Sequence, residues 1–123
     1  MRFLIYGSGD FAATVTELIR HCGHEVAGYV DDFNSGPYVL GTLDRVAISH
    51  PPETHVMALA IGYKNIPGRW LAWEKARQAG YRFPALIHPR AYVADSAQVA
   101  EGAMVMAGAL VDVRARIGEA VVA

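Results

Sequence analysis

The chain has 123 residues and a formal net charge of −1, with 53% hydrophobic and 19% charged residues. This balance is typical of a globular domain and leaves no basic field for a nucleic acid, so we expect no nucleic-acid partner. No segment is long and apolar enough for a membrane span, and the first residues lack a signal peptide; both predict a cytoplasmic protein. The single cysteine, Cys22, allows no internal disulfide and fits a reducing compartment.

The first thirty residues have the pattern of a strand, a glycine turn, a helix and a second strand. The apolar run 3–6 ends in the turn 7–10, and residues 11–22 carry apolar side chains at helical spacing. A second apolar run, 26–30, ends at the pair Asp31-Asp32. This order predicts a βαβ unit whose parallel strands are buried on both faces.

The middle of the chain predicts one more long strand and one more long helix. Residues 38–40 suggest a short edge strand, whereas 44–48 fit no single element. The longest apolar run, 56–61, predicts a central strand with a loop at its carboxyl end, and 69–79 predicts a helix. The residues expected to face inward from this helix are Trp70, Trp73 and Ala76.

After Pro89 the pattern changes to a period of six residues. Branched aliphatic residues recur at every sixth position, and alanines recur with the same period four residues later. This period is typical of the hexapeptide repeat of a parallel β-helix; the alternative is an accidental regularity in an Ala/Val-rich stretch. The aliphatic side chains are expected inside the coil and the alanines at its corners. The two series are Val93, Val99, Val105, Val111 and Ile117, and Ala97, Ala103, Ala109 and Ala115.

Two polar groups follow the predicted strands at the edge where open α/β sheets bind ligands. The turn 7–10 precedes a helix whose first N–H groups suit a phosphate, but a turn with Ser8 or Asp10 as helix cap has the same pattern. Asp31 and Asp32 suit ribose hydroxyl groups, or alternatively only start a turn.

The loop after the third strand is a further candidate for ligand contacts. Gly62 ends the strand at the ligand-binding edge, and Asn65 is a polar side chain in the same loop. Lys64 and Arg69 are candidate phosphate contacts or solvated surface charges. We expect no metal site, because the remaining histidines lack ligand spacing. These are His21, His24, His50 and His55.

Three features in fixed order resemble bacterial nucleotide-sugar acetyltransferases, the family of sialic acid O-acetyltransferase-like proteins and UDP-4-amino-sugar N-acetyltransferases. They are the turn 7–10, the pair Asp31-Asp32 and the segment 86–91 directly before the repeats. The resemblance covers the whole chain. It implies a small Rossmann-like nucleotide-sugar-binding domain at 1–87, followed at 88–123 by the start of a left-handed parallel β-helix. In this family the β-helix forms a homotrimer and holds acetyl-CoA between subunits.

The resemblance implies an acetyl-CoA-dependent acetyltransferase acting on a nucleotide-linked amino sugar, with UDP as the expected nucleotide, in glycan biosynthesis. The family's catalytic histidine lies in a later coil, and no histidine follows His88. We therefore expect no catalytic residue and little of the acetyl-CoA site here, and no activity from this chain alone. Asp10 departs from the glycine or histidine of many relatives. The substrate-binding residues that the resemblance implies are Ser8, Gly9, Asp10, Asp31, Asp32, Gly62 and Asn65.

Two alternatives remain from the residues alone. The pattern Gly7-x-Gly9-x-x-Ala12 with Asp31 is close to the fingerprint of an NAD(P)-binding oxidoreductase, although the chain is short for that fold and the repeats do not belong to it. The second alternative is a non-catalytic module that only binds a nucleotide sugar. The sequence identifies neither the sugar nor its acceptor atom. Because the coil ends in an open edge, we expect self-association or fraying within 93–123.

Overall fold

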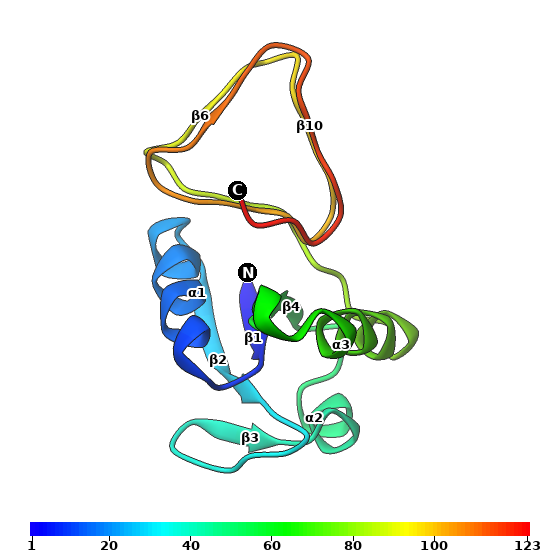
Figure 1. The fold of residues 1–123 in the computed structure, drawn as a ribbon. Helices are drawn as coiled ribbons and strands as arrows, with labels where there is room; N and C mark the ends of the chain where they lie inside the picture. Colours follow the sequence, from blue (N-terminus) through cyan, green and yellow to red (C-terminus); the bar gives the residue numbers. More distant parts are fainter.

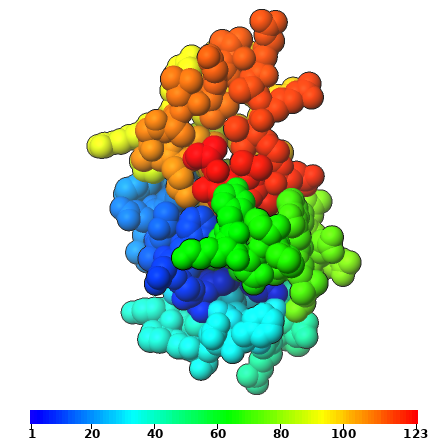
Figure 2. Space-filling model, viewed as in Figure 1, coloured from blue at the N-terminus to red at the C-terminus, as the bar shows by residue number.

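The computed structural model describes all residues from Met1 to Ala123 and has two parts, a layered α/β domain and a triangular coil at one end of it (Figure 1). The last residues of the coil lie against the segment near Tyr63, whose hydroxyl accepts a hydrogen bond from the Val122 N–H (Figure 2). The domain contains β1 (Arg2–Tyr6), α1 (Asp10–His21), β2 (Glu25–Val30), β3 (Val39–Gly41), α2 (Leu43–Ser49), β4 (Val56–Leu59), the 3₁₀ helix η1 (Tyr63–Asn65) and α3 (Ile66–Gln78). The coil contains β5 (Leu86–Ile87), β6 (Tyr92–Val93), β7 (Gln98–Val99), β8 (Met104–Val105), β9 (Leu110–Val111) and β10 (Arg116–Ile117).

The domain is built on one parallel sheet with the strand order β3-β2-β1-β4. The predicted strand, helix and strand at 3–30 are confirmed as β1, α1 and β2, and the short edge strand is confirmed as β3. Because β1 lies between β2 and β4 and pairs with both in parallel, the turns after these three strands lie together at the carboxyl ends of the strands.

The expectation that 56–61 forms a central strand is wrong. β4 is the last strand of the sheet, and on its outer side the N–H of Met57 donates to the carbonyl of Arg82 at 2.9 Å. The apolar run reflects the burial of both faces of β4, where Met57, Ala58 and Leu59 are all at most 3% exposed. Burial of the faces does not determine whether a strand is central or at the edge.

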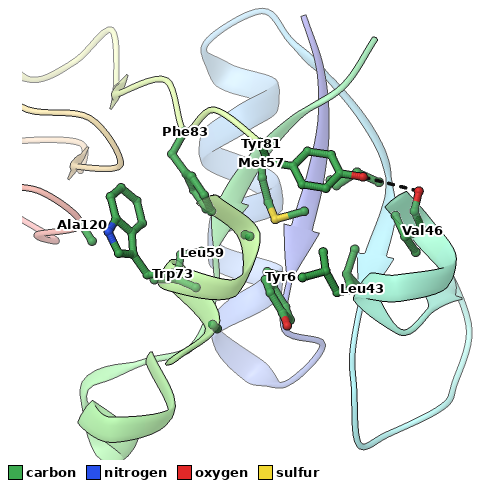
Figure 3. Packing of buried hydrophobic residues seen from close by; sticks show 13 residues of the cluster. Tyr6, Leu43, Val46, Met57, Leu59, Trp73, Tyr81, Phe83 and Ala120 are labelled. Carbon is green, nitrogen blue, oxygen red and sulfur yellow. Dashed lines mark hydrogen bonds between the residues drawn. The ribbon is translucent and has the colours of Figure 1, made fainter. Parts of the chain in front are cut away.

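Helices cover both faces of the sheet, α1 on one side and α2 with α3 on the other (Figure 1). Side chains of β1 alternate between the two cores: Phe3 and Ile5 pack with α1, whereas Leu4 and Tyr6 pack with α2 and α3. Figure 3 shows this second core, which extends through Trp73 to Ala120 of the coil. The alternation follows from the period of two along a strand.

Two helices differ from the sequence prediction. The open segment 44–48 is helical, as α2. In α3 the side chains of Trp73 and Ala76 are buried as predicted, but Trp70 is 45% exposed. The other buried residues of this helix are Ala72 and Arg69, and Arg69 is only 2% exposed. A charged side chain at an inward position is not expected from the hydrophobic pattern. None of the helices combines the length and apolar character that crossing a membrane requires.

The coil pairs each short strand with the strand 18 residues later, which is three hexapeptides. β5 pairs with β8, β6 with β9 and β7 with β10, all in parallel, and Met104 pairs with Val122 in the same way. In the aliphatic series Val105 and Val111 are buried, while Val93, Val99 and Ile117 are partly buried. The pairing already begins at Leu86, inside the segment expected to belong to the first domain.

The coil is packed against α3. The ring of Trp73 lies so close to Gly102 that a Cβ there would be 2.7 Å from Cη2 of the indole. Next to it, Arg77 forms ion pairs with Glu101 at 3.2 Å and Glu119 at 3.4 Å, two glutamates 18 residues apart on neighbouring turns of the coil. The close packing of Trp73 on Gly102 and the ion pairs of Arg77 therefore hold the coil against α3.

We predict that Gly102→Ala destabilises the protein by about 2 kcal/mol more than Gly108→Ala, because only the first methyl group overlaps a neighbour. Both glycines have φ of 78°, so the backbone strain of the two substitutions is matched, and nothing lies within 4 Å of a Cβ at Gly108. Urea unfolding of both variants measures the difference. Equal free energies of unfolding would show that the Trp73 contact does not hold the coil.

Candidate functional site

A cleft of about 310 Å³ opens at the edge of the sheet where β1, β2 and β4 end. Its walls are the turn after β1, the loop after β2 and the face of α3 that carries residues 68–75. These surround the carboxyl ends of the strands, where parallel sheets bind ligands. Five of the seven predicted site residues line it: Ser8, Gly9, Asp31, Asp32 and Asn65. Asp10 and Gly62 instead line a neighbouring depression of about 510 Å³, which also reaches Gly9.

A larger and more open depression of about 710 Å³ lies at the opposite ends of the strands. Its lining includes Arg2, Glu25 and His55, and few of its residues are apolar. Volume alone would favour it. We place the site in the smaller cleft, because this cleft combines strand ends, a helix start and an apolar floor, as expected for an organic ligand.

The backbone of Gly7 shapes the cleft. Gly7 has φ of 116°, and a Cβ at this position would lie 2.9 Å from the carbonyl oxygen of Ala60 in the segment after β4. The N–H of Gly7 donates to the carbonyl of Val30 at 2.8 Å, at the end of β2. The turn after β1 thus touches the ends of both neighbouring strands, which only glycine permits.

The other two predicted glycines have a different character. Gly9 is the residue before the first turn of α1 and Gly62 the residue before η1, with φ of −79° and −78°. Nothing lies within 4 Å of a Cβ at either position, so the fold itself does not require glycine there. No side chain caps α1, which does not support the alternative reading of Ser8 or Asp10 as a cap and leaves the first N–H groups of the helix free for an anion.

Asp31 links the loop after β2 to the turn after β1. Its Oδ2 accepts a hydrogen bond from the Ser8 hydroxyl at 2.5 Å, and its Oδ1 accepts the N–H groups of Phe33 and Asn34, both at 2.9 Å. Burial acts to raise the pKa of Asp31, but these hydrogen bonds more than offset it, so the pKa lies below the usual range. Asp31 therefore starts a turn, as one reading predicts, and also places an anionic carboxylate in the cleft.

Asp32 connects three elements of the domain. Its carboxylate accepts hydrogen bonds from the Tyr6 hydroxyl, from Nζ of Lys75 at 3.0 Å and from the N–H of Leu43 at 2.9 Å, the first residue of α2. Burial and the hydrogen bond to Asp32 both raise the pKa of Tyr6. Three protein donors thus occupy Asp32, which holds Lys75 in the cleft wall. The sequence carries no signal for Lys75, because only the fold brings α3 to this carboxylate.

Asn65 and Arg69 mark where the loop after β4 turns into α3. The Oδ1 of Asn65 accepts the N–H of Gly68 at 3.1 Å and so caps α3, and Asn65 also lines the cleft. Arg69 is neither a free phosphate contact nor a surface charge. Its buried guanidinium donates to the carbonyls of Ile61 and Ala120.

We predict that the same substitution lowers stability by unequal amounts at two glycines of the turn after β1. Gly7→Ala should cost about 2 kcal/mol or more, because the methyl group meets Ala60 at a strained φ. Gly9→Ala should cost less than about 1 kcal/mol, the usual loss for an uncapped helix start. Thermal unfolding of both variants measures this, and similar losses at the two positions would contradict the assignment of Gly7 to the fold and Gly9 to the ligand.

We predict that Asp32→Asn is less stable than the unaltered chain by about 1–2 kcal/mol at pH 7. This loss is kept small because Lys75 is partly exposed, and solvent weakens its attraction to Asp32. The pKa of Asp32 is below its ordinary 3.8, since its hydrogen bonds outweigh burial. Its stabilisation is therefore present above the ordinary pKa of 3.8 and is lost as the pH falls through the lower, folded-state pKa. Unfolding measured from pH 7 to pH 2 should show the two chains converge in acid. The control is Asp95→Asn, an exposed coil residue, and a constant difference at all pH values would refute the role of the carboxylate charge.

Comparison with known proteins gives one family model and several solved structures. The model of the PglD N-terminal domain matches residues 2–72. A variant of perosamine N-acetyltransferase from Caulobacter crescentus, solved with CoA and GDP-perosamine, is 29% identical, with a TM-score of 0.88 over 99% of this chain and 59% of that one. PerB from the same organism, with the same ligands, is 31% identical, with a TM-score of 0.82 over 97% and 57%.

The acetyltransferase domain of PglB from Neisseria gonorrhoeae, solved with acetyl coenzyme A, is 28% identical, with a TM-score of 0.79 over 98% of this chain and 60% of that one. No curated protein sequence matches significantly. The chain spans 57 to 60% of the length of these three solved chains. The family model covers more than half of the 123 residues, including the turn after β1 and the aspartate pair. The chain therefore belongs to the nucleotide-sugar acetyltransferase family that carries the PglD N-terminal domain.

Proposed function

We propose that this chain is the nucleotide-sugar-binding part of an acetyl-CoA-dependent acetyltransferase, which transfers an acetyl group to the amino group of a nucleotide-linked sugar. The observation that carries the proposal is the uncapped start of α1, where Gly9, the residue before the helix, lines the cleft together with the anionic Asp31, and Asp10 borders the adjoining depression. Free N–H groups at a helix start bind phosphate, and a carboxylate at the end of the second strand binds ribose hydroxyl groups. The solved neighbours with CoA and GDP-perosamine support the same class of ligand.

The predicted residues have distinct roles in this proposal. The N–H groups at Gly9 and Asp10 hold the diphosphate, and the missing Cβ of Gly9 lets it approach the backbone. Asp31 accepts from the ribose, while Ser8 orients Asp31. Asp32 acts mainly by holding Lys75, whose ammonium group lies in the cleft wall. Asn65, at the start of α3, donates to the ligand from the same wall as Lys75, and Gly62 borders the adjoining depression where the sugar would extend.

The cleft binds and orients the acceptor sugar but does not supply the base. No histidine lines the cleft or the adjoining depression, and no histidine follows His88. Acetyl-CoA would supply the activated acetyl group, and a base outside this chain would take the proton from the attacking amine. We therefore propose that the chain binds the nucleotide sugar and has no transferase activity alone.

We also propose that the coil is the start of a left-handed parallel β-helix at about 88–123, after a binding domain at about 1–87, and that the intact protein is a homotrimer. The 18-residue spacing of parallel pairs supports the β-helix. Apolar side chains on the outside of the coil support assembly, because monomers rarely leave such groups uncovered. These are Tyr92, Leu110 and Val113, which are 60%, 70% and 59% exposed.

The runner-up is an NAD(P)-binding module, which the glycine pattern Gly7-x-Gly9-x-x-Ala12 favours. The sheet has four strands, whereas the full dinucleotide-binding fold has six. The nucleotide is a second open point. UDP is the nucleotide proposed from the sequence, and GDP competes with it because two solved neighbours contain GDP-perosamine.

Calorimetric titration tests the proposal with four ligands: a UDP-linked amino sugar, GDP-perosamine, NAD and acetyl-CoA. We expect one of the nucleotide sugars to bind and NAD not to bind. Asp31→Ala and Gly9→Ala should each weaken binding at least about 10-fold, since each removes or blocks a polar contact worth about 1.4 kcal/mol or more. Asp95→Ala on the coil should bind like the unaltered chain. Binding of NAD without either nucleotide sugar would make the oxidoreductase reading the better one.

A further inference from the structure

Phe33 is an exposed aromatic residue at the edge of the cleft. Its side chain is 92% exposed, the highest value among the large apolar residues, and it lines the cleft directly after the aspartate pair. A single exposed apolar residue is ordinary on a protein surface. The position of this one, at a cleft that already has an anion-binding helix start, distinguishes it from Tyr38, which is 81% exposed in the same connection but does not line the cleft.

The backbone beneath Phe33 is fixed although its ring is free. The N–H of Phe33 donates to Oδ1 of Asp31 at 2.9 Å, the N–H of Asn34 donates to the same oxygen at 2.9 Å, and Asp31 is itself held by Ser8 at 2.5 Å. The ring therefore projects from a hydrogen-bonded turn. When a ligand packs on the ring, only the side-chain rotamer has to become ordered, because the backbone of the turn is already fixed.

A second exposed apolar side chain lines the same cleft from a different element. Leu71 of α3 is 59% exposed, and Phe33 and Leu71 are the two exposed large apolar residues in the lining. Val30 and Ala60, both buried, add apolar surface to the same lining. A cleft that combines these groups with helix N–H groups and Lys75 is complementary to a ligand with a flat apolar ring and an attached diphosphate.

We infer that Phe33 is the stacking platform for the nucleobase of the nucleotide sugar, with Leu71 packing on the base from α3. This inference rests on the proposed function of the cleft and adds the part that recognises the base. Stacking on an aromatic ring is tolerant of the base, because every base has a π face. Phe33 therefore contributes affinity for GDP and UDP alike, and the choice between them depends on the polar groups around the edge of the base.

Titration of GDP and UDP into the full chain tests this inference. Phe33→Ala should weaken the binding of whichever nucleotide binds by about 10-fold, the usual loss for one stacked base. Phe33→Trp should bind at least as well as the unaltered chain, and its added fluorescence should be quenched by the nucleotide but not by inorganic pyrophosphate. Tyr38→Ala, which removes an equally exposed aromatic from the same connection, is the matched control and should bind normally.

The outcomes separate this inference from the proposed function. If the unaltered chain binds a nucleotide and Phe33→Ala binds it equally well, or if the Phe33→Trp emission does not change, the platform is wrong while the nucleotide site stands. If Tyr38→Ala weakens binding as much as Phe33→Ala, the effect belongs to the whole connection and the platform is also wrong. If the unaltered chain binds neither GDP nor UDP, the proposed function fails and the platform with it.

Discussion

The cleft depends on one close contact between two stretches of backbone. The turn after β1 passes so near the carbonyl of Ala60 that no side chain fits on Gly7, and the same turn is hydrogen-bonded to the end of β2. This contact brings three strand ends within reach of one ligand. It also brings Gly9, the residue before α1, into the lining of the cleft, and the free N–H groups and partial positive charge at this helix start favour an anion. The roles that we propose for Gly9 and Asp31 follow from that placement.

A buried cation joins the loop beside the cleft to the coil. The guanidinium of Arg69 is almost fully buried without a carboxylate partner and instead donates to the carbonyls of Ile61 and Ala120. Its Cζ also lies over the ring of Tyr63, 5.1 Å from the ring centroid. Burial lowers the pKa of Arg69, as expected for a charge removed from water. Such a group is costly unless its donors are satisfied. The arrangement fixes the loop after β4 relative to the coil.

The sequence predicts the parts of the fold that depend on local pattern. β1, α1, β2 and the six-residue period follow from the spacing of apolar residues, and the position of Asp31 follows from the end of a buried strand. The errors concern the neighbours of each element. The apolar run at 56–61 reflects the burial of both faces of β4 and does not determine its position in the sheet. The burial of Arg69 depends on carbonyl partners that are distant in the sequence, so no local pattern predicts it.

The candidate site was predictable to the same extent. A turn before a helix and a carboxylate after a strand are local signals, so five of the seven expected residues lie in one cleft. Lys75 and Leu71 come from α3 and carry no local signal, because their places depend on how that helix packs against the sheet. Phe33 adjoins the aspartate pair, but its exposure cannot be inferred from a chain in which aromatic residues are usually buried.

A crystal structure of the chain with its nucleotide sugar tests most directly whether the start of α1 is the diphosphate site. We expect phosphate oxygens within about 3 Å of the backbone nitrogens of Gly9 and Asp10, the ordinary N–H···O distance. We also expect the ribose to lie against Asp31. A ligand bound at the opposite ends of the strands, or one in the cleft with its phosphates away from α1, would contradict it.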